Sequence, residues 1–241
     1  MYRIALLIEY DGTRYFGFQF QKNLPTVQGE IEKALFKLFG REVKLRGASR
    51  TDAGAHALGQ VASFVPPSDI PEDKIKSALN HYLPPDIKIR ACSKIPFDFD
   101  VRKAESRTYI YIVLNRETPS AIWGRFSYHV RNPLDIGIMN RAFSMMVGRR
   151  DFSPFTLSSY PFSRVREVKE TGIKKKGDFI IFKMRARSFL PQQVRRTVGT
   201  LILLGLGKMN MDEFISILEG KGEAKFAPPA RGLFLFGIKY K

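Results

Sequence analysis

Cysteine and histidine are scarce in this chain of 241 residues, which has one cysteine and three histidines. The lone Cys92 excludes an intramolecular disulfide and a cysteine-rich metal cluster, and such usage is typical of a reducing compartment. The histidines, His56, His81 and His129, do not have the spacing of a zinc site. We therefore expect neither a metal nor a cofactor.

Long hydrophobic runs are absent as well. No window approaches the roughly 18 apolar residues of a membrane span, and the longest candidate, around Leu201 to Leu206, is interrupted by Gly205. The N-terminal segment acquires Glu9 and Asp11 before any cleavage site of a signal peptide. A cytoplasmic protein that does not enter a membrane is the expectation.

Acidic residues are few relative to basic ones: 40 Lys and Arg stand against 23 Asp and Glu, which gives a net charge of +17. Residues 121–241 carry 22 basic and 9 acidic residues, a net charge of +13, so most of the excess lies in the second half. A solubilising surface does not require so large an excess of one sign. The charge favours a polyanionic partner, with nucleic acid first.

Glycine motifs that bind phosphates are also missing. The closest stretch to a nucleotide-hydrolysing loop, GLGKM, lacks the first glycine and the hydroxyl residue that the motif needs. No G-x-G-x-x-G follows a predicted strand. Nucleotide hydrolysis and dinucleotide chemistry are not expected.

What is present is a regular alternation of apolar patterns. Period-2 segments predict strands at 2–10, 43–48, 60–65, 87–93, 108–115, 126–130, 165–173, 179–187 and 233–240. Helical spacing predicts helices at 27–39, 72–82, 135–148, 191–204 and 211–219. The two halves, 1–116 and 117–241, share an approximate β-α-β-β-α-β order. This order predicts an α+β protein built on antiparallel sheet.

The third predicted helix illustrates the boundary signals. We expect Asp135 to cap its start, Gly148 to close its end, and Met145 and Met146 to lie on its buried face with Ile138, Ala142 and the core methionine Met139. In the fourth helix, Pro191 is expected in the first turn, where its missing N–H does no harm.

The most unusual segment is GASRTDAGAHALGQVASF, residues 47–64. Small residues surround Asp52, the only carboxylate between Glu42 and Asp69, and Gly54 permits close approach of another group. From these residues alone, Asp52 is either a functional carboxylate or the closing residue of a local turn.

The sequence resembles the tRNA pseudouridine synthase A family. The resemblance begins with RTDAGAHALGQV at 50–61 and extends to YDGTRYFGFQFQ at 10–21, VQGEIEKAL at 27–35, FDVRKAESRTYIY at 99–111, SFLPQQVRRTVG at 188–199 and APPARGLFL at 227–235. These segments occur in family order and span essentially the whole chain. The chain departs from the common family pattern at Phe18, Phe20, Asp100 and Pro191.

The resemblance implies four catalytic residues. Asp52 is expected to be the nucleophile of an isomerisation in which the glycosidic bond of uridine breaks and C5 bonds to C1′. Arg195 is expected to pair with this carboxylate, because a neighbouring cation keeps a partly buried carboxylate ionised. Tyr109 is expected to stack on the uracil and help remove the C5 proton, and Arg50 to hold the flipped nucleotide.

Substrate binding is expected to involve Tyr109 again, together with Leu233 in the uracil pocket and Arg196 at a phosphate. The implied fold has two ferredoxin-like halves, of the kind found in RNA-recognition motifs, which share a long antiparallel sheet with a basic central cleft.

The implied function is that of an isomerase, an intramolecular transferase that modifies nucleotides 38, 39 and 40 in the anticodon stem-loop of tRNA. The implied enzyme is a homodimer and uses no cofactor. Two alternatives stay open: a synthase for other RNA positions, and a non-catalytic RNA-binding module.

Overall fold

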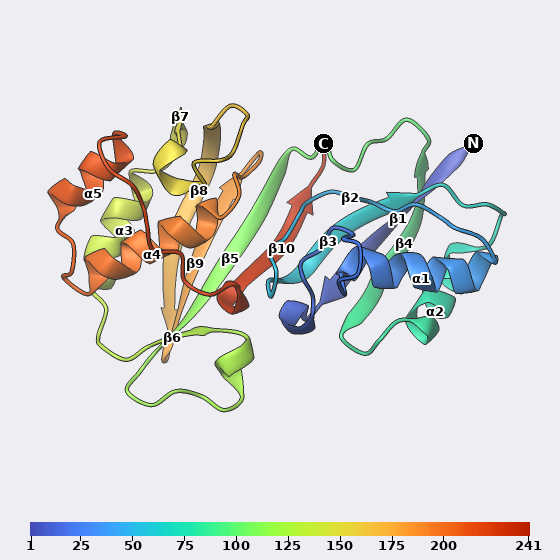
Figure 1. The fold of residues 1–241 in the computed structure, drawn as a ribbon, viewed down its shortest axis with the longest axis horizontal. Coiled ribbons are helices and arrows are strands. Elements are labelled where there is room, and N and C mark those ends of the chain that lie inside the picture. The colour runs from blue at the N-terminus through green and yellow to red at the C-terminus, as the bar shows by residue number, and fades with distance from the viewer. The chain divides into compact units, whose positions relative to one another are not determined.

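The computed structural model describes residues 1–241, which form two compact units (Figure 1). Unit 1 contains Met1–Glu105 and Phe234–Lys241, and unit 2 contains Ser106–Leu233. The sequence prediction put the division after residue 116. The structure divides the chain earlier because β5 (Ser106–Asn115) pairs with β9 (Phe179–Ala186) along nearly its whole length. The predicted α+β class is confirmed.

Unit 1 consists of a β-sheet and two α-helices. Its strand order is β4 (Ile87–Pro96), β1 (Tyr2–Tyr10), β3 (His56–Phe64) and β10 (Leu233–Lys239), and the short β2 (Arg46–Gly47) also pairs with β3. All these pairs are antiparallel except β10 with β3. Helices α1 (Val27–Phe39) and α2 (Glu72–Tyr82) contact each other, and α2 packs on β4.

Helix α1 shows how local sequence builds this unit. The side chain of Thr26 accepts a hydrogen bond from the N–H of Gly29 at 3.2 Å and so caps the first turn. Val27, Ile31 and Leu35 are buried at helical spacing. Gly40 then ends the helix in the left-handed conformation. The predicted helix is confirmed.

The strands that flank residues 48–55 differ from the prediction. The expected strand at 43–48 shrinks to Arg46–Gly47, because the N–H of Leu45 donates to the carboxylate of Glu32 on α1 at 2.9 Å instead of joining a ladder. Strand β3 begins earlier than predicted because β10 pairs with its first residues, Phe234 lying opposite His56.

Unit 2 also combines a sheet with α-helices, but its strands are connected differently. Its strands lie in the order β5, β9, β8 (Val165–Lys176) and β7 (Gly148–Asp151), and β6 (Tyr128–Val130) pairs with β5 in parallel. Helices α3 (Ile136–Ser144), α4 (Gln193–Gly205) and α5 (Met211–Leu218) complete the unit. The β8–β9 hairpin turns at Gly177, as predicted. Four short 3-10 helices are η1 (Gly12–Arg14), η2 (Trp123–Arg125), η3 (Ser153–Phe155) and η4 (Ala230–Gly232).

The predicted end of α3 is wrong. Asp135 caps its start as expected, but the helix ends at Ser144, and Gly148 begins β7 with a φ of 108°. The N–H groups of Met146 and Val147 donate to the carbonyls three residues earlier, which tightens the chain into a turn. As a result Met146 is buried, whereas Met145 is exposed.

The predicted start of α4 is also wrong. The helix begins at Gln193, and Gln192 before it adopts a left-handed conformation with a φ of 59°. The buried side chain of Gln193 accepts the N–H of Leu190 at 2.8 Å. This bond fixes the approach to the helix and leaves Pro191 outside the first turn.

None of the helices combines the length and apolar content that crossing a bilayer requires.

Candidate active site

Asp52 lies in unit 1 on the loop 48–55 between β2 and β3. The fully buried Gln60 of β3 holds the start of this loop: its Nε2 donates to the carbonyl of Ser49 at 2.7 Å, and its Oε1 accepts the N–H of Ser49 at 3.3 Å. The N–H of Ala48 donates to the carbonyl of Val61 at 2.8 Å. The side-chain amide of Gln60 therefore makes the hydrogen bonds to Ser49 that a neighbouring strand would make in a sheet.

The residue before Asp52 is held from a second side. The hydroxyl groups of Tyr10 and Thr51 lie 2.8 Å apart in a buried hydrogen bond. The N–H of Phe18 donates to the carbonyl of Thr51 at 3.3 Å. Because β1 and the segment after it both contact Thr51, the neighbouring Asp52 is attached to the body of unit 1.

A tight main-chain turn completes the loop. The N–H of Ala55 donates to the carbonyl of Asp52 at 3.1 Å, and the N–H of Gly54, which has a φ of 77°, donates to the carbonyl of Tyr15 at 3.1 Å. Gly12 packs so closely on Ala55 that a Cβ at position 12 would overlap its carbonyl oxygen. The loop conformation thus depends on glycine at two points.

His56 is a residue whose position the sequence prediction missed. It is buried, its Nδ1 accepts the N–H of Gly12 at 3.0 Å, and its ring stacks on Phe234 with centroids 4.6 Å apart. The signal available in the sequence was its position, four residues after Asp52 within the segment RTDAGAHALGQV. His56 joins the loop of Asp52 to both η1 and β10.

Unit 2 carries Tyr109 on β5. The ring is buried and meets Phe189 edge-on with centroids 5.2 Å apart. On the same face of β5, the hydroxyl of Tyr111 donates to the carbonyl of Pro229 at 2.7 Å. Burial raises the pKa of Tyr111 well above its usual value, so its phenol remains a donor at neutral pH.

Arg195 and Arg196 are neighbours on α4 with different contacts. Nε of Arg195 donates to the carbonyl of Pro228 at 2.9 Å. Nη1 of Arg196 lies 3.1 Å from the carboxylate of Glu223 and 3.0 Å from the carbonyl of Ala224. These bonds tie Arg196 to the chain between α5 and η4, and its expected role at a phosphate stays a prediction.

The structure brings some of the predicted residues together within unit 2. The adjacent residues Pro228 and Pro229 accept hydrogen bonds from α4 and β5, the elements that carry Arg195 and Tyr109. Leu233 follows shortly afterwards, at the end of η4, and is buried. Asp52 and the exposed Arg50 belong to unit 1, so the pairing of Asp52 with Arg195 stays a prediction.

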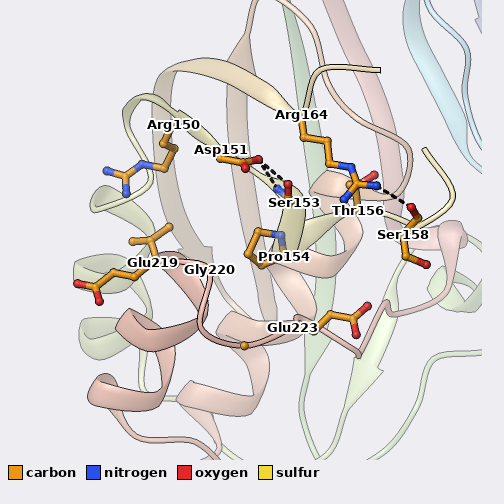
Figure 2. A pocket seen from close by; sticks show the side chains of 12 residues that line it. Arg150, Asp151, Ser153, Pro154, Thr156, Ser158, Arg164, Glu219, Gly220 and Glu223 are labelled. Carbon is orange, nitrogen blue, oxygen red and sulfur yellow. Dashed lines mark hydrogen bonds between the residues drawn. The ribbon is translucent and has the colours of Figure 1, made fainter. Parts of the chain in front are cut away.

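Three other features of a chain could carry chemistry: a metal site, a reactive cysteine and a cavity. No cluster of three or more His, Cys, Asp or Glu side chains is arranged to hold a metal ion. Burial raises the pKa of Cys92 to about 11, so its thiol is protonated at neutral pH. A cavity of about 520 Å³ in unit 2 is lined by none of the predicted site residues (Figure 2).

Comparison with known proteins assigns the class. A family model described as tRNA pseudouridine synthase matches residues 6–102 and 142–241. Proteins named tRNA pseudouridine synthase A from Acetivibrio thermocellus and Thermoanaerobacter sp. (strain X514) are each 42% identical to this chain over 244 residues, and one from Ruminiclostridium cellulolyticum is 41% identical over 245 residues. Each alignment covers 100% of both chains.

These matches define an isomerase, which confirms the predicted class of enzyme. The chain belongs to the tRNA pseudouridine synthase family.

Proposed function

We propose that this protein converts uridine to pseudouridine in tRNA, at nucleotides 38, 39 and 40 of the anticodon stem-loop. The observation that carries the proposal is the placement of Asp52 on a loop that Gln60 and Thr51 hold in position, in a chain of this family. Recognition of RNA shape and phosphates suits an enzyme that modifies several adjacent positions. The net charge of +17 supports such recognition.

The proposed reaction is an internal rearrangement. The bond between N1 and C1′ breaks, the uracil turns in the site, C5 bonds to C1′, and the C5 hydrogen leaves as a proton while N1 gains one. The carboxylate of Asp52 acts as the nucleophile at C1′ or C6, or promotes a glycal intermediate. Since atoms and electrons balance within the nucleotide, the reaction needs no cofactor.

The other predicted residues take the following parts in this proposal. Arg195 supplies positive charge to Asp52, and Arg50 holds the flipped nucleotide. Tyr109 stacks on the uracil and helps remove the C5 proton, while Leu233 lines the base pocket. Arg196 contributes to phosphate binding.

We further propose that the enzyme acts in the cytoplasm as a homodimer, because two copies present a larger basic surface to one tRNA. Light scattering is expected to give a mass near twice 27.5 kDa. A monomeric mass at the working concentration would exclude the dimer.

The decisive experiment uses tRNA transcripts labelled with tritium at uridine C5. Wild-type protein should release tritium, and Asp52→Asn should lower the rate by at least ~10³-fold, as loss of a catalytic nucleophile does. Binding of tRNA should change little in this variant, since asparagine is nearly isosteric with the half-buried Asp52. Asp98→Asn, on an exposed aspartate, is the matched control and should keep full activity.

The remaining outcomes are equally informative. Full turnover by Asp52→Asn would refute the assignment of the nucleophile. Intact tRNA binding without tritium release by the wild type would favour the RNA-binding module. Release from uridines outside positions 38–40 would identify a synthase for other positions.

A further inference from the structure

Unit 2 contains another pocket that no predicted site residue lines. Its volume is about 430 Å³, and its walls come from β7, the beginning of β8 and the chain just after β9. We call it the arginine pocket. Its lining residues are Arg149, Ser163, Val165, Arg166, Glu167, Arg187 and Ser188.

Two guanidinium groups of this pocket have no protein partner. The side chains of Arg149 and Arg187 form no hydrogen bond and no ion pair within the structure. Glu167 lies opposite Arg149 in the β7–β8 ladder, yet its carboxylate forms no ion pair within 4.0 Å. Two unpaired arginines on one pocket offer bidentate donors to an external anion.

The third arginine, Arg166, adds its charge to the pocket and also holds the neighbouring loop. Nη1 of Arg166 donates to the carbonyl of Ser163 at 2.8 Å, and its Nη2 donates to the hydroxyl of Tyr160 at 3.3 Å. From the other side of the same loop, Nη2 of Arg164 donates to the carbonyl of Ser158 at 2.6 Å (Figure 2). The loop at 158–163 is therefore held by two arginines, which gives the pocket a defined wall.

An exposed aromatic residue lies on the same loop, next to Ser163 of the pocket lining. Phe162 directly precedes Ser163 and is 71% exposed, and its ring meets that of Tyr160 at 5.6 Å. Arginines beside an exposed aromatic ring are typical of surfaces that bind a phosphate backbone and stack a base. This composition favours RNA over an inorganic anion or an acidic protein.

The pocket is attached to the strand of Tyr109. Nη1 of Arg107, two residues before Tyr109 on β5, donates to the carbonyl of Arg187 at 2.6 Å. Phe189, two residues after Arg187, packs on the ring of Tyr109. The chain just after β9 therefore contacts both the pocket and the strand that carries Tyr109.

The larger cavity of unit 2 provides a contrast. It is also lined by arginines, Arg150 and Arg164, but Asp151, Glu219 and Glu223 add three carboxylates to its walls (Figure 2). Acidic groups in excess of basic ones oppose the binding of a phosphate. The arginine pocket differs from this cavity because its lining contains three arginines and a single carboxylate, that of Glu167.

We propose that the arginine pocket binds a phosphodiester of the substrate RNA next to the target uridine. Arg149 and Arg187 contact the phosphate, and Phe162 stacks on an adjacent base. The assignment of this RNA as tRNA rests on the proposed function, whereas the binding of RNA by the pocket is tested separately.

The test measures the affinity for an unmodified tRNA transcript as a function of salt. Arg149→Gln and Arg187→Gln should each weaken binding about threefold to tenfold and reduce the salt slope by about 0.7 to 0.9, the change expected when one phosphate contact is lost. Arg141→Gln removes the same charge from the exposed face of α3 and should leave the slope unchanged. Arg149→Lys and Arg187→Lys should keep most of the salt slope, because lysine keeps the positive charge.

Two further variants define the site. Glu167→Gln should tighten binding about twofold, since it removes a negative charge beside the phosphate. Phe162→Ala should weaken binding by about fivefold or more without changing the salt slope, because stacking releases no counterions.

The result that would overturn the proposal is specific. If the arginine variants at 149 and 187 bind tRNA with the affinity and salt slope of Arg141→Gln, the pocket does not contact phosphate. If the wild type releases no tritium but the arginine variants still bind RNA more weakly than Arg141→Gln, the proposed function fails and the pocket assignment stands.

Discussion

The two units hold their predicted site residues in different ways. In unit 1, Asp52 lies on a loop, and its position depends on individual bonds from Gln60 and Thr51. In unit 2, Tyr109 and Arg195 lie on a strand and a helix, whose repeating hydrogen bonds hold them whether or not one contact is lost. A loop has no such redundancy. Single substitutions around Asp52 should therefore impair activity more, relative to stability, than those in unit 2.

The largest effect outside the catalytic residues is expected at Gly12. Gly12→Ala introduces a Cβ that overlaps the carbonyl oxygen of Ala55, so the loop of Asp52 must move. A displacement of about 1 Å at a reacting group costs roughly 10²-fold in rate. We expect a loss of this size in tritium release. The matched control is Gly172→Ala in unit 2, where a Cβ meets nothing within 4 Å. Normal activity of Gly12→Ala would remove the proposed difference between the units.

The second effect concerns the amide of Gln60. Gln60→Leu fills a similar volume but removes the two hydrogen bonds that the Gln60 amide makes with the part-buried main chain of Ser49. Each lost hydrogen bond contributes about 0.5–1.5 kcal/mol, so the free energy of unfolding should fall by roughly 1–3 kcal/mol. Turnover at a temperature where the variant is folded should also fall about tenfold, since the loop gains freedom. Denaturant unfolding together with tritium release measures both quantities. A variant that loses stability but keeps full turnover would show that Gln60 does not position Asp52.

Elements with local signals were predictable from the sequence. Helix α1 follows from the spacing of Val27, Ile31 and Leu35 and from Gly40 at its end, and β1 follows from simple alternation. The start of α4 was not predictable from Pro191, because the bond between Gln193 and Leu190 overrides the usual preference for proline in the first turn.

The residues that contact the site residues were harder to predict from the sequence than the helices and strands. Asp52 stands out by composition, but the bonds that hold its loop come from residues such as Tyr10 and Gln60, which the fold brings there from other strands. Similarly, Arg149 and Arg187 share a pocket only because β7, β8 and β9 are neighbours in the sheet. Contacts between residues so far apart in the chain leave no local sequence pattern from which they could be predicted.

A smaller effect is expected in unit 2 at Tyr111. Tyr111→Phe removes the hydrogen bond to the carbonyl of Pro229 and should lower the free energy of unfolding by about 1 kcal/mol. Because β5 keeps its pairing with β9, Tyr109 should stay in place and turnover should change less than about twofold. Thermal unfolding and tritium release check the two expectations. A loss of activity comparable to that of Gln60→Leu would contradict the view that regular elements buffer the site residues of unit 2.

The smallest effect is expected at Asp100, one of the positions at which the chain departs from the pattern of the family that it resembles. A hydrogen bond from the Arg102 guanidinium holds the pKa of Asp100 at about 2. Because the pKa is lowered in the folded state, the ionised carboxylate stabilises the fold above its ordinary pKa of 3.8, and this contribution is lost as the pH falls toward 2. Arg102 is largely exposed, so the contribution should stay below about 1 kcal/mol.

Urea unfolding of wild type and Asp100→Asn should therefore differ slightly at pH 7 and converge between about pH 4 and pH 2. A difference that persists at pH 2 would assign the effect to packing rather than to the charge. Turnover should be unchanged at pH 7, since the carboxylate of Asp100 bonds to Arg102 and not to the loop of Asp52.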